Sequence, residues 1–154
     1  KPVTLRASIS YAVCEKLCIP VEAQAELAFV SVASTEDGAI SAALDTVPKP
    51  AKVGDAGPIS IHEVRREGNV VQVEIAVQDD KPPAGKEKDV QLFVEGPTPD
   101  WALPVPKLVK REAGVQRFAF ELDGLPPGAS ADGATLKLTV TGSGGAYEVN
   151  AKLP

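Results

Sequence analysis

The chain of 154 residues contains no methionine, one histidine and two cysteines, and each shortage excludes a class of site. A structural zinc site needs about four nitrogen or sulfur ligands, and Cys14, Cys18 and His62 supply too few. We interpret His62 as a surface histidine, because the sequence places no nucleophile and acid partner beside it. Two thiolates alone can hold Cu(I), although the soft methionine ligands of many such sites are missing. We therefore expect no cofactor and no metal, with Cu(I) binding by the cysteines as an alternative.

Long apolar runs and clusters of basic residues are also missing. No apolar run approaches the roughly 20 residues that a membrane-spanning helix needs. The formal net charge is −5, and the basic residues cluster no further than the pairs Arg65-Arg66 and Lys110-Arg111. An electrostatic surface for DNA or RNA is therefore lacking. We expect no nucleic-acid partner and no direct membrane insertion, and two cysteines without methionine suit an oxidising compartment.

Alternation of apolar and polar residues dominates the chain and is interrupted by 13 glycines and 14 prolines, which is typical of an all-β protein. One alternating run leads up to Cys14 and another leaves Cys18. The apolar members of these runs are Val3, Leu5, Ala7, Ile9 and Tyr11, then Ala25, Leu27 and Phe29. The sequence thus predicts two strands over residues 1–33, joined at the cysteines as a hairpin.

A short helix and a linker are expected over residues 34–57. Residues 34–37 are typical helix-capping residues. Ile40, Ala43, Leu44 and Val47 follow at the three- and four-residue spacings of an amphipathic helix. Residues 48–58 are rich in proline and glycine and lack periodicity, so we interpret them as a linker or long loop and as the best candidate for a domain boundary.

Residues 58–154 carry about seven further alternating segments, separated by turn residues. Hairpins are expected through residues 67–69, 112–114 and 142–145. This number and spacing of strands predict an immunoglobulin-like β-sandwich. Acidic residues in the segment 79–89 alternate with lysines, which favours a solvated loop over a calcium site. Trp101, in a proline-rich loop, is expected to plug one end of the sandwich rather than to bind a ligand.

The cysteine pair is the most informative feature of the sequence. A disulfide between Cys14 and Cys18 would close a very small loop, and the stabilisation expected of a cross-link grows with loop length. Reversible exchange is then a better reason for the pair than stability, because exchange needs two sulfurs within bonding reach and an accessible thiolate. The spacing by itself leaves a structural disulfide and a redox pair about equally favoured. Tyr11 could shield the sulfurs, but a tyrosine at the end of an alternating strand more often serves simple packing.

Residues 11–20, Tyr-Ala-Val-Cys-Glu-Lys-Leu-Cys-Ile-Pro, resemble the cysteine motif in the periplasmic N-terminal region of the DsbD and ScsB family of protein-disulfide reductases. In that family a Cys-x(n)-Cys-x-Pro segment lies in a hairpin near the end of an immunoglobulin-like domain. The helix, the Val-Pro-Lys-Pro connection and the loop 96–104 also resemble members with a second immunoglobulin-like domain. The resemblance therefore extends over most of the chain, although the cysteine motif is its specific part.

The resemblance implies a reaction and partners. Cys14 and Cys18 would cycle between dithiol and disulfide in the periplasm. They would take electrons from a membrane-embedded donor and reduce a thioredoxin-like or disulfide-isomerase-like protein. By analogy with the family, Cys18 would attack and Cys14 would resolve the mixed disulfide. The rival hypothesis is a non-catalytic immunoglobulin-like binding or adaptor module whose disulfide is inert.

The chain departs from the family pattern at its start. Full members place most strands of the redox domain before the motif, whereas 13 residues precede Cys14 here. Residues 1–33 are therefore expected to be the C-terminal hairpin of a redox immunoglobulin-like domain most of which is absent. Residues 34–57 would be the helix and linker, and residues 58–154 the second domain.

Overall fold

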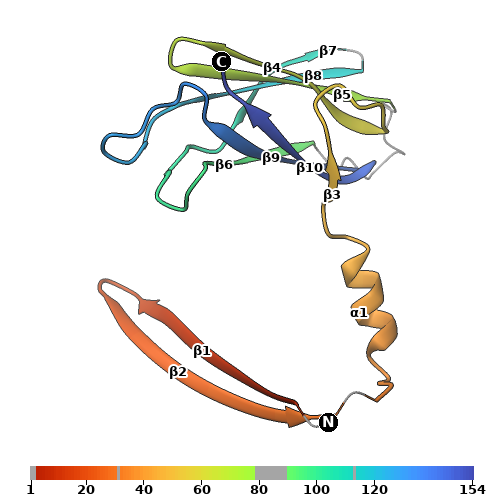
Figure 1. Ribbon diagram of the computed structural model, residues 1–154, viewed down its shortest axis with the longest axis vertical. Coiled ribbons are helices and arrows are strands. Elements are labelled where there is room, and N and C mark those ends of the chain that lie inside the picture. Colours follow the sequence, from red (N-terminus) through yellow and green to blue (C-terminus); the bar gives the residue numbers. More distant parts are fainter. Residues whose placement is uncertain (1–2, 31, 79–89, 113) are drawn as a thin grey trace. The chain divides into compact units, whose positions relative to one another are not determined.

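The computed structural model describes residues 3–30, 32–78, 90–112 and 114–154 (Figure 1). The chain separates into two compact units, Lys1–Ala42 and Ala43–Pro154. The segment 79–89, which the sequence predicts to be a solvated loop, lies outside the described residues.

The first unit is built on a long β-hairpin. Strand β1 (Val3–Cys14) pairs antiparallel with β2 (Cys18–Phe29) without interruption, from Val3 opposite Phe29 to Cys14 opposite Cys18. The alternation of apolar and polar residues on both sides of the cysteines predicts this pairing, and the predicted hairpin is confirmed. A two-stranded hairpin is marginally stable in water unless it packs against something else.

Helix α1 (Asp37–Leu44) follows the hairpin, as the capping residues predict. The backbone N–H of Ser34 donates to Asp37 Oδ2 over 3.0 Å, and the N–H of Glu36 donates to Ser34 Oγ over 3.2 Å. These bonds satisfy backbone donors at the start of the helix, where no carbonyl of a preceding turn is available. After Leu44, the N–H groups of Thr46 and Val47 bond back to Ala43 and Leu44 and close the last turn.

The second unit is an immunoglobulin-like β-sandwich, which confirms the predicted fold class. One sheet has the order β3-β10-β9-β6 and the other the order β4-β5-β8-β7. Their strands are β3 (Lys49–Ala51), β4 (Ile59–Glu67), β5 (Val70–Val77), β6 (Gln91–Glu95), β7 (Lys107–Glu112), β8 (Val115–Glu121), β9 (Thr135–Gly142) and β10 (Gly145–Lys152). The three hairpins predicted in this region are present as β4-β5, β7-β8 and β9-β10.

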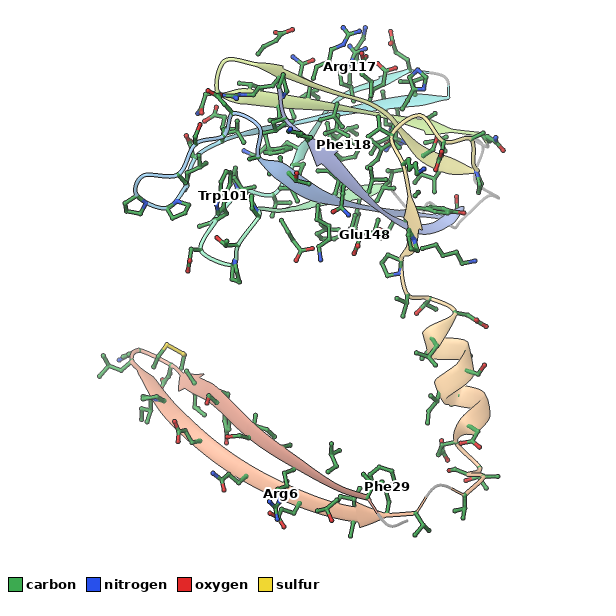
Figure 2. All side chains as sticks on the ribbon, in the orientation of Figure 1. Arg6, Phe29, Trp101, Arg117, Phe118 and Glu148 are labelled. Atoms are coloured by element: carbon green, nitrogen blue, oxygen red, sulfur yellow. A yellow bond between two sulfur atoms is a disulfide. The ribbon has the colours of Figure 1, made fainter. Side chains whose placement is uncertain are left out.

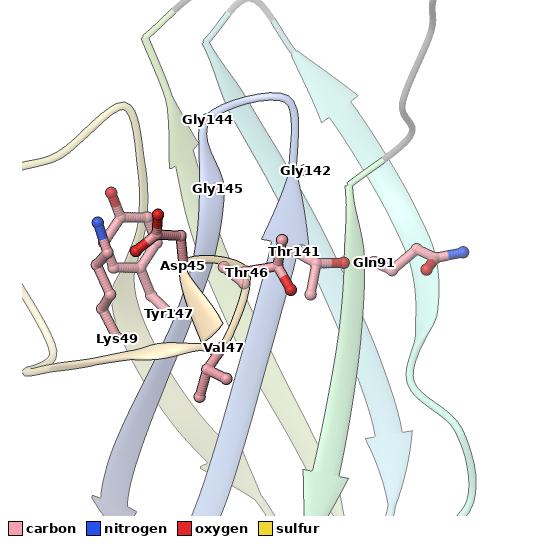
Figure 3. A pocket seen from close by; sticks show the side chains of 11 residues that line it. Asp45, Thr46, Val47, Lys49, Gln91, Thr141, Gly142, Gly144, Gly145 and Tyr147 are labelled. Carbon is pink, nitrogen blue, oxygen red and sulfur yellow. The ribbon is translucent and has the colours of Figure 1, made fainter. Parts of the chain in front are cut away.

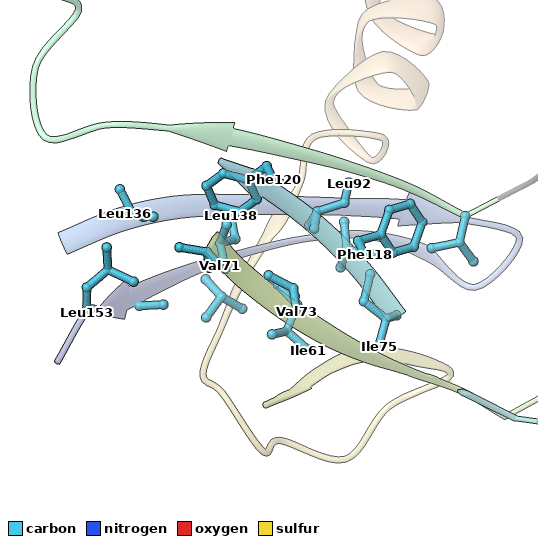
Figure 4. Packing of buried hydrophobic residues seen from close by; sticks show 14 of the residues in the cluster. Ile61, Val71, Val73, Ile75, Leu92, Phe118, Phe120, Leu136, Leu138 and Leu153 are labelled. Carbon is cyan, nitrogen blue, oxygen red and sulfur yellow. The ribbon is translucent and has the colours of Figure 1, made fainter. Parts of the chain in front are cut away.

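The core of the sandwich comes from the alternate residues of these strands (Figure 4). Val71, Val73 and Ile75 of β5 face inward and are fully buried, as are Leu136, Leu138 and Val140 of β9. Phe118 and Phe120 of β8 fill the space between the sheets. Burial of this apolar surface is the main favourable term in folding of the unit.

Two features of the second unit bear on the sequence interpretation. Strand β3 lies within the segment predicted to be a linker and pairs in parallel with β10, with Lys49 opposite Tyr147. Three residues that include Pro50 are too few to produce an alternation signal. Trp101 packs partly buried against the core, as expected of a plug, and the α-carbon of Gly96 lies so close that an added Cβ would meet the tryptophan side chain.

Candidate functional site

Cys14 and Cys18 form a disulfide at the tip of the hairpin in the first unit, drawn as a yellow bond in Figure 2. The S–S distance is 2.05 Å and the two α-carbons lie 4.0 Å apart. The cysteines are directly opposite each other and form the last paired row of the ladder. The strand register therefore places the two cysteines side by side, with their sulfurs within bonding reach.

The turn that joins the cysteines contains Glu15, Lys16 and Leu17. The N–H of Glu15 donates to the carbonyl oxygen of Leu17 over 3.2 Å, which closes the turn tightly. Both cysteines are exposed, and the side chain of Leu17 is 82% exposed. Within the described residues, the disulfide is thus open to solvent and to another thiol.

The register divides the hairpin into two faces, because side chains of a strand alternate between its two sides. We call one the sulfur face, made of Thr4, Arg6, Ser8, Ser10, Ala12 and Cys14 with Cys18, Pro20, Glu22, Gln24, Glu26 and Ala28. We call the other the apolar face, made of Val3, Leu5, Ala7, Ile9, Tyr11 and Val13 with Ile19, Val21, Ala23, Ala25, Leu27 and Phe29. Because a two-stranded ribbon twists strongly, each face changes direction gradually along the hairpin, and its members are defined by their paired rows.

The apolar face contains no polar group among its side chains except the hydroxyl of Tyr11. Its eight largest exposed side chains range in exposure from 46% at Phe29 to 65% at Ile19. Contiguous exposed apolar patches of this kind mark surfaces that contact protein, membrane or an apolar ligand. The apolar face is therefore the part of the hairpin that is suited to burial.

The sulfur face is polar along most of its length. Arg6 Nε and Glu26 Oε1 form a cross-strand ion pair of 2.7 Å, and both side chains are mostly exposed, so that the pair adds little stability. Near the open end of the ribbon, Figure 2 shows Arg6 and Phe29 on opposite sides. The disulfide thus shares its face with polar and small side chains, and the apolar side chains lie behind it.

The sequence analysis identified the cysteines as the candidate site, but it did not predict that they lie on the face opposite the apolar side chains. Tyr11 lies on the apolar face opposite Val21, so it is placed for packing and not as a shield for the sulfurs. The spacing carried the necessary signal, because the cysteines and the apolar residues of the flanking strands are separated by odd numbers of positions. His62 lies exposed in β4 of the other unit, beside an irregularity in the pairing, as expected of a surface histidine.

The second unit has an open depression of about 760 Å³ beside the turn between β9 and β10. Asp45, Lys49 and Tyr147 lie together on one side of it in Figure 3, and Gln91 lies on the other. Asp45 and Lys49 are exposed to solvent, and every residue that lines the depression belongs to the second unit, whereas the cysteines belong to the first. We assign it no role in the chemistry of the cysteines.

The described residues hold neither a cluster of metal ligands nor a membrane-spanning helix. In that part of the chain, no three His, Cys, Asp or Glu side chains come together as a metal site would require. None of the described helical segments has the length and apolar character needed to cross a membrane.

No protein-family model matches the chain, and no curated protein matches it in sequence. Among solved structures, the chain is similar to the N-terminal periplasmic domain of ScsB from Proteus mirabilis, with a TM-score of 0.67 and 16% sequence identity. The match covers 97% of this chain and 57% of that chain, so the sequence spans little more than half of the ScsB domain. At this identity the likeness concerns the fold. The structural comparison thus agrees with the expected fold, because the chain is folded like part of the N-terminal periplasmic domain of ScsB.

Proposed function

We propose that the chain belongs to a periplasmic thiol-disulfide exchange protein of the DsbD and ScsB type, in which Cys14 and Cys18 relay electrons to oxidised partner proteins. The observation that supports this most directly is the exposed disulfide at the hairpin tip, in a chain with the fold of a ScsB domain. A reactive disulfide must be reachable by an attacking thiolate, and this one is.

The position of the disulfide argues against a purely structural role. It joins residues only four apart, and these are already paired in the ladder. The cross-link therefore restricts the unfolded chain less than one that closes a long loop would. A bond that contributes little to the fold can be broken and formed again without loss of structure.

The proposed reaction consists of two exchanges. The thiolate of Cys18 attacks the disulfide of an oxidised partner, so that one partner sulfur leaves as a thiolate and a mixed disulfide forms. The thiolate of Cys14 then attacks Cys18 Sγ, which releases the partner as a dithiol and leaves the Cys14–Cys18 disulfide. Two electrons and two protons pass to the partner. A membrane-embedded dithiol donor reverses the change by reducing the disulfide.

The domain organisation is part of the proposal. Residues 1–33 form the cysteine-bearing hairpin of a redox immunoglobulin-like domain, residues 34–57 link it, and residues 58–154 form a second domain. The apolar face supports this assignment, because a hairpin of two strands needs further strands or a packed layer to be stable.

A trapping experiment tests the function. The probe is a thioredoxin variant that keeps only its attacking cysteine, activated as a mixed disulfide with thionitrobenzoate. The Cys14→Ser variant, which keeps Cys18, should release thionitrobenzoate and form a stable cross-link. The Cys18→Ser variant should react more slowly, and the reduced wild type should form the cross-link and then resolve it to free thioredoxin.

The controls make the outcome decisive. The double serine variant should not react. If the reduced wild type fails to react, or holds the cross-link without resolving it, the pair is not an exchange centre. The inert-disulfide module would then be the better explanation.

A further inference from the structure

The hairpin places the disulfide and the apolar surface on opposite faces. Cys14 and Cys18 share the sulfur face with the next row on that side, Ala12 opposite Pro20. The row between them, Val13 opposite Ile19, belongs to the apolar face. Val13 is therefore nearer to Cys14 along the chain than Ala12 is, yet it points away from the sulfurs.

This sidedness limits how a protein partner can reach the disulfide. An attacking sulfur must come into line with the S–S bond at one of the two cysteines. The strands themselves block approach through the ribbon. Same-face rows are about 7 Å apart, so a protein that contacts the disulfide from the sulfur face also lies over the row of Ala12 and Pro20.

The size and charge of the side chains on the sulfur face also indicate what kind of partner surface fits there. The two rows next to the disulfide contain Ala12, Pro20, Ser10 and Glu22, of which one carries a charge. Apart from the exposed turn residues Glu15 and Lys16, whose charges are opposite, the surface beside the disulfide is made of small and mostly uncharged side chains. Such a surface suits a partner whose reactive cysteine is surrounded by neutral backbone and apolar side chains.

We propose that the redox partner docks on the sulfur face, across Ala12 and Pro20, and leaves the apolar face untouched. This inference rests on the proposed function and identifies the surface through which that function operates. The apolar face remains available for a packed layer while exchange takes place on the other side. One hairpin thereby carries both a structural surface and a reactive one.

Paired substitutions in the full chain test the proposal. Ala12→Trp adds bulk beside the disulfide on the sulfur face, and Val13→Trp adds the same bulk on the apolar face. Tryptophan is well tolerated in strands. The measurements are the rate constants for reduction of the disulfide by reduced thioredoxin and by dithiothreitol.

The expected result is a selective effect. Ala12→Trp should slow reduction by thioredoxin by about tenfold or more, while reduction by dithiothreitol changes by less than about threefold, because a small thiol needs less space. Val13→Trp should leave both rates near those of the wild type. Ser10→Trp, one row further from the sulfurs, should slow thioredoxin by a smaller factor, and it replaces Ala12→Trp if that variant does not fold.

The outcomes separate the inference from the function. Equal slowing by Ala12→Trp and Val13→Trp, or slowing by Val13→Trp alone, would overturn the docking face while exchange itself stands. If the wild-type disulfide resists both reductants, the proposed function fails. If dithiothreitol reduces the wild type and thioredoxin does not, docking of a thioredoxin-like partner is contradicted.

Discussion

At the scale of single residues, two close contacts stand out, one in each unit. The Cys14–Cys18 pair is set by strand register and lies exposed. The Gly96–Trp101 pair is set by packing, because an added Cβ at Gly96 would collide with the Trp101 side chain. The first contact is suited to chemistry, and the second holds the proline-rich loop against the end of the sandwich.

We expect Gly96→Ala to destabilise the second unit by about 1–3 kcal/mol, because the methyl group forces the tryptophan or the loop to move. The free energy of unfolding from urea titration, followed by tryptophan fluorescence, measures this. Gly57→Ala is the matched control, since its added Cβ would lie 3.4 Å from the Ile59 carbonyl oxygen. That variant should stay within about 1 kcal/mol of the wild type. Equal stability of the two variants would show that the Gly96 contact carries no strain.

The candidate site residues were easier to identify from the sequence than their surroundings. Cysteine is scarce in this chain, so Cys14 and Cys18 stand out without any structure. The role of Trp101 as a plug also follows from its position in a proline-rich loop. The close approach of Gly96 could not be predicted, because it depends on how the loop folds back on itself in space.

At the scale of elements, the hairpin and the edge strand β7 differ in how their side chains are distributed between their faces. The hairpin has one apolar face and one polar face. Strand β7 is exposed along its whole length, carries Lys107, Lys110 and Arg111, and has a pairing irregularity between Leu108 and Lys110. Lysines and bulges protect an edge strand from pairing with other chains. Strand β7 is therefore an edge strand whose charges and bulge disfavour pairing with a strand of another molecule.

The Lys110 and Glu112 pair on β7 should be visible in a titration. The hydrogen bond and the charge of Lys110 Nζ, 2.8 Å away, lower the pKa of Glu112 from its ordinary value of 4.5. The folded state therefore gains stability above pH 4.5 and loses it as the pH falls through the lowered pKa, by a small amount because both groups are exposed. Carboxyl NMR should report this lowered pKa, and Lys110→Met should return it to the ordinary range. An unchanged value in Lys110→Met would rule out the lysine as the cause.

The hairpins could largely be predicted from the sequence, whereas the short strand β3 and the face that carries the disulfide were not predicted. Alternation with turn residues at 67–69, 112–114 and 142–145 was sufficient to predict three hairpins. Strand β3 was missed because three residues show no period, and its parallel pairing with β10 joins segments far apart in sequence. The sidedness of the disulfide was also missed, although the odd spacing between each cysteine and the apolar residues of its strand carried the signal.

At the scale of the whole molecule, the chain consists of two compact units, Lys1–Ala42 and Ala43–Pro154. The disulfide lies in the first unit, and the large apolar core lies in the second. The oxidation state of the cysteines should therefore leave the stability of the sandwich unaffected.

We expect dithiothreitol to leave the melting temperature of the sandwich unchanged, as measured by the fluorescence of Trp101. Leu138→Ala, which removes a fully buried side chain from β9, is the positive control. It should cost about 2–5 kcal/mol and lower the melting temperature clearly. A large shift on reduction of the wild type would show that the disulfide supports the second unit, contrary to the division described above.

The reduction potential of the Cys14–Cys18 pair tests the central claim most directly. It is measured by equilibrating the full chain with glutathione or dithiothreitol buffers and quantifying the dithiol by mass spectrometry after thiol alkylation. Thiol-disulfide exchange proteins have potentials between about −120 and −270 mV, and we expect a value in this range. A potential well below about −300 mV, typical of structural disulfides, would contradict the account.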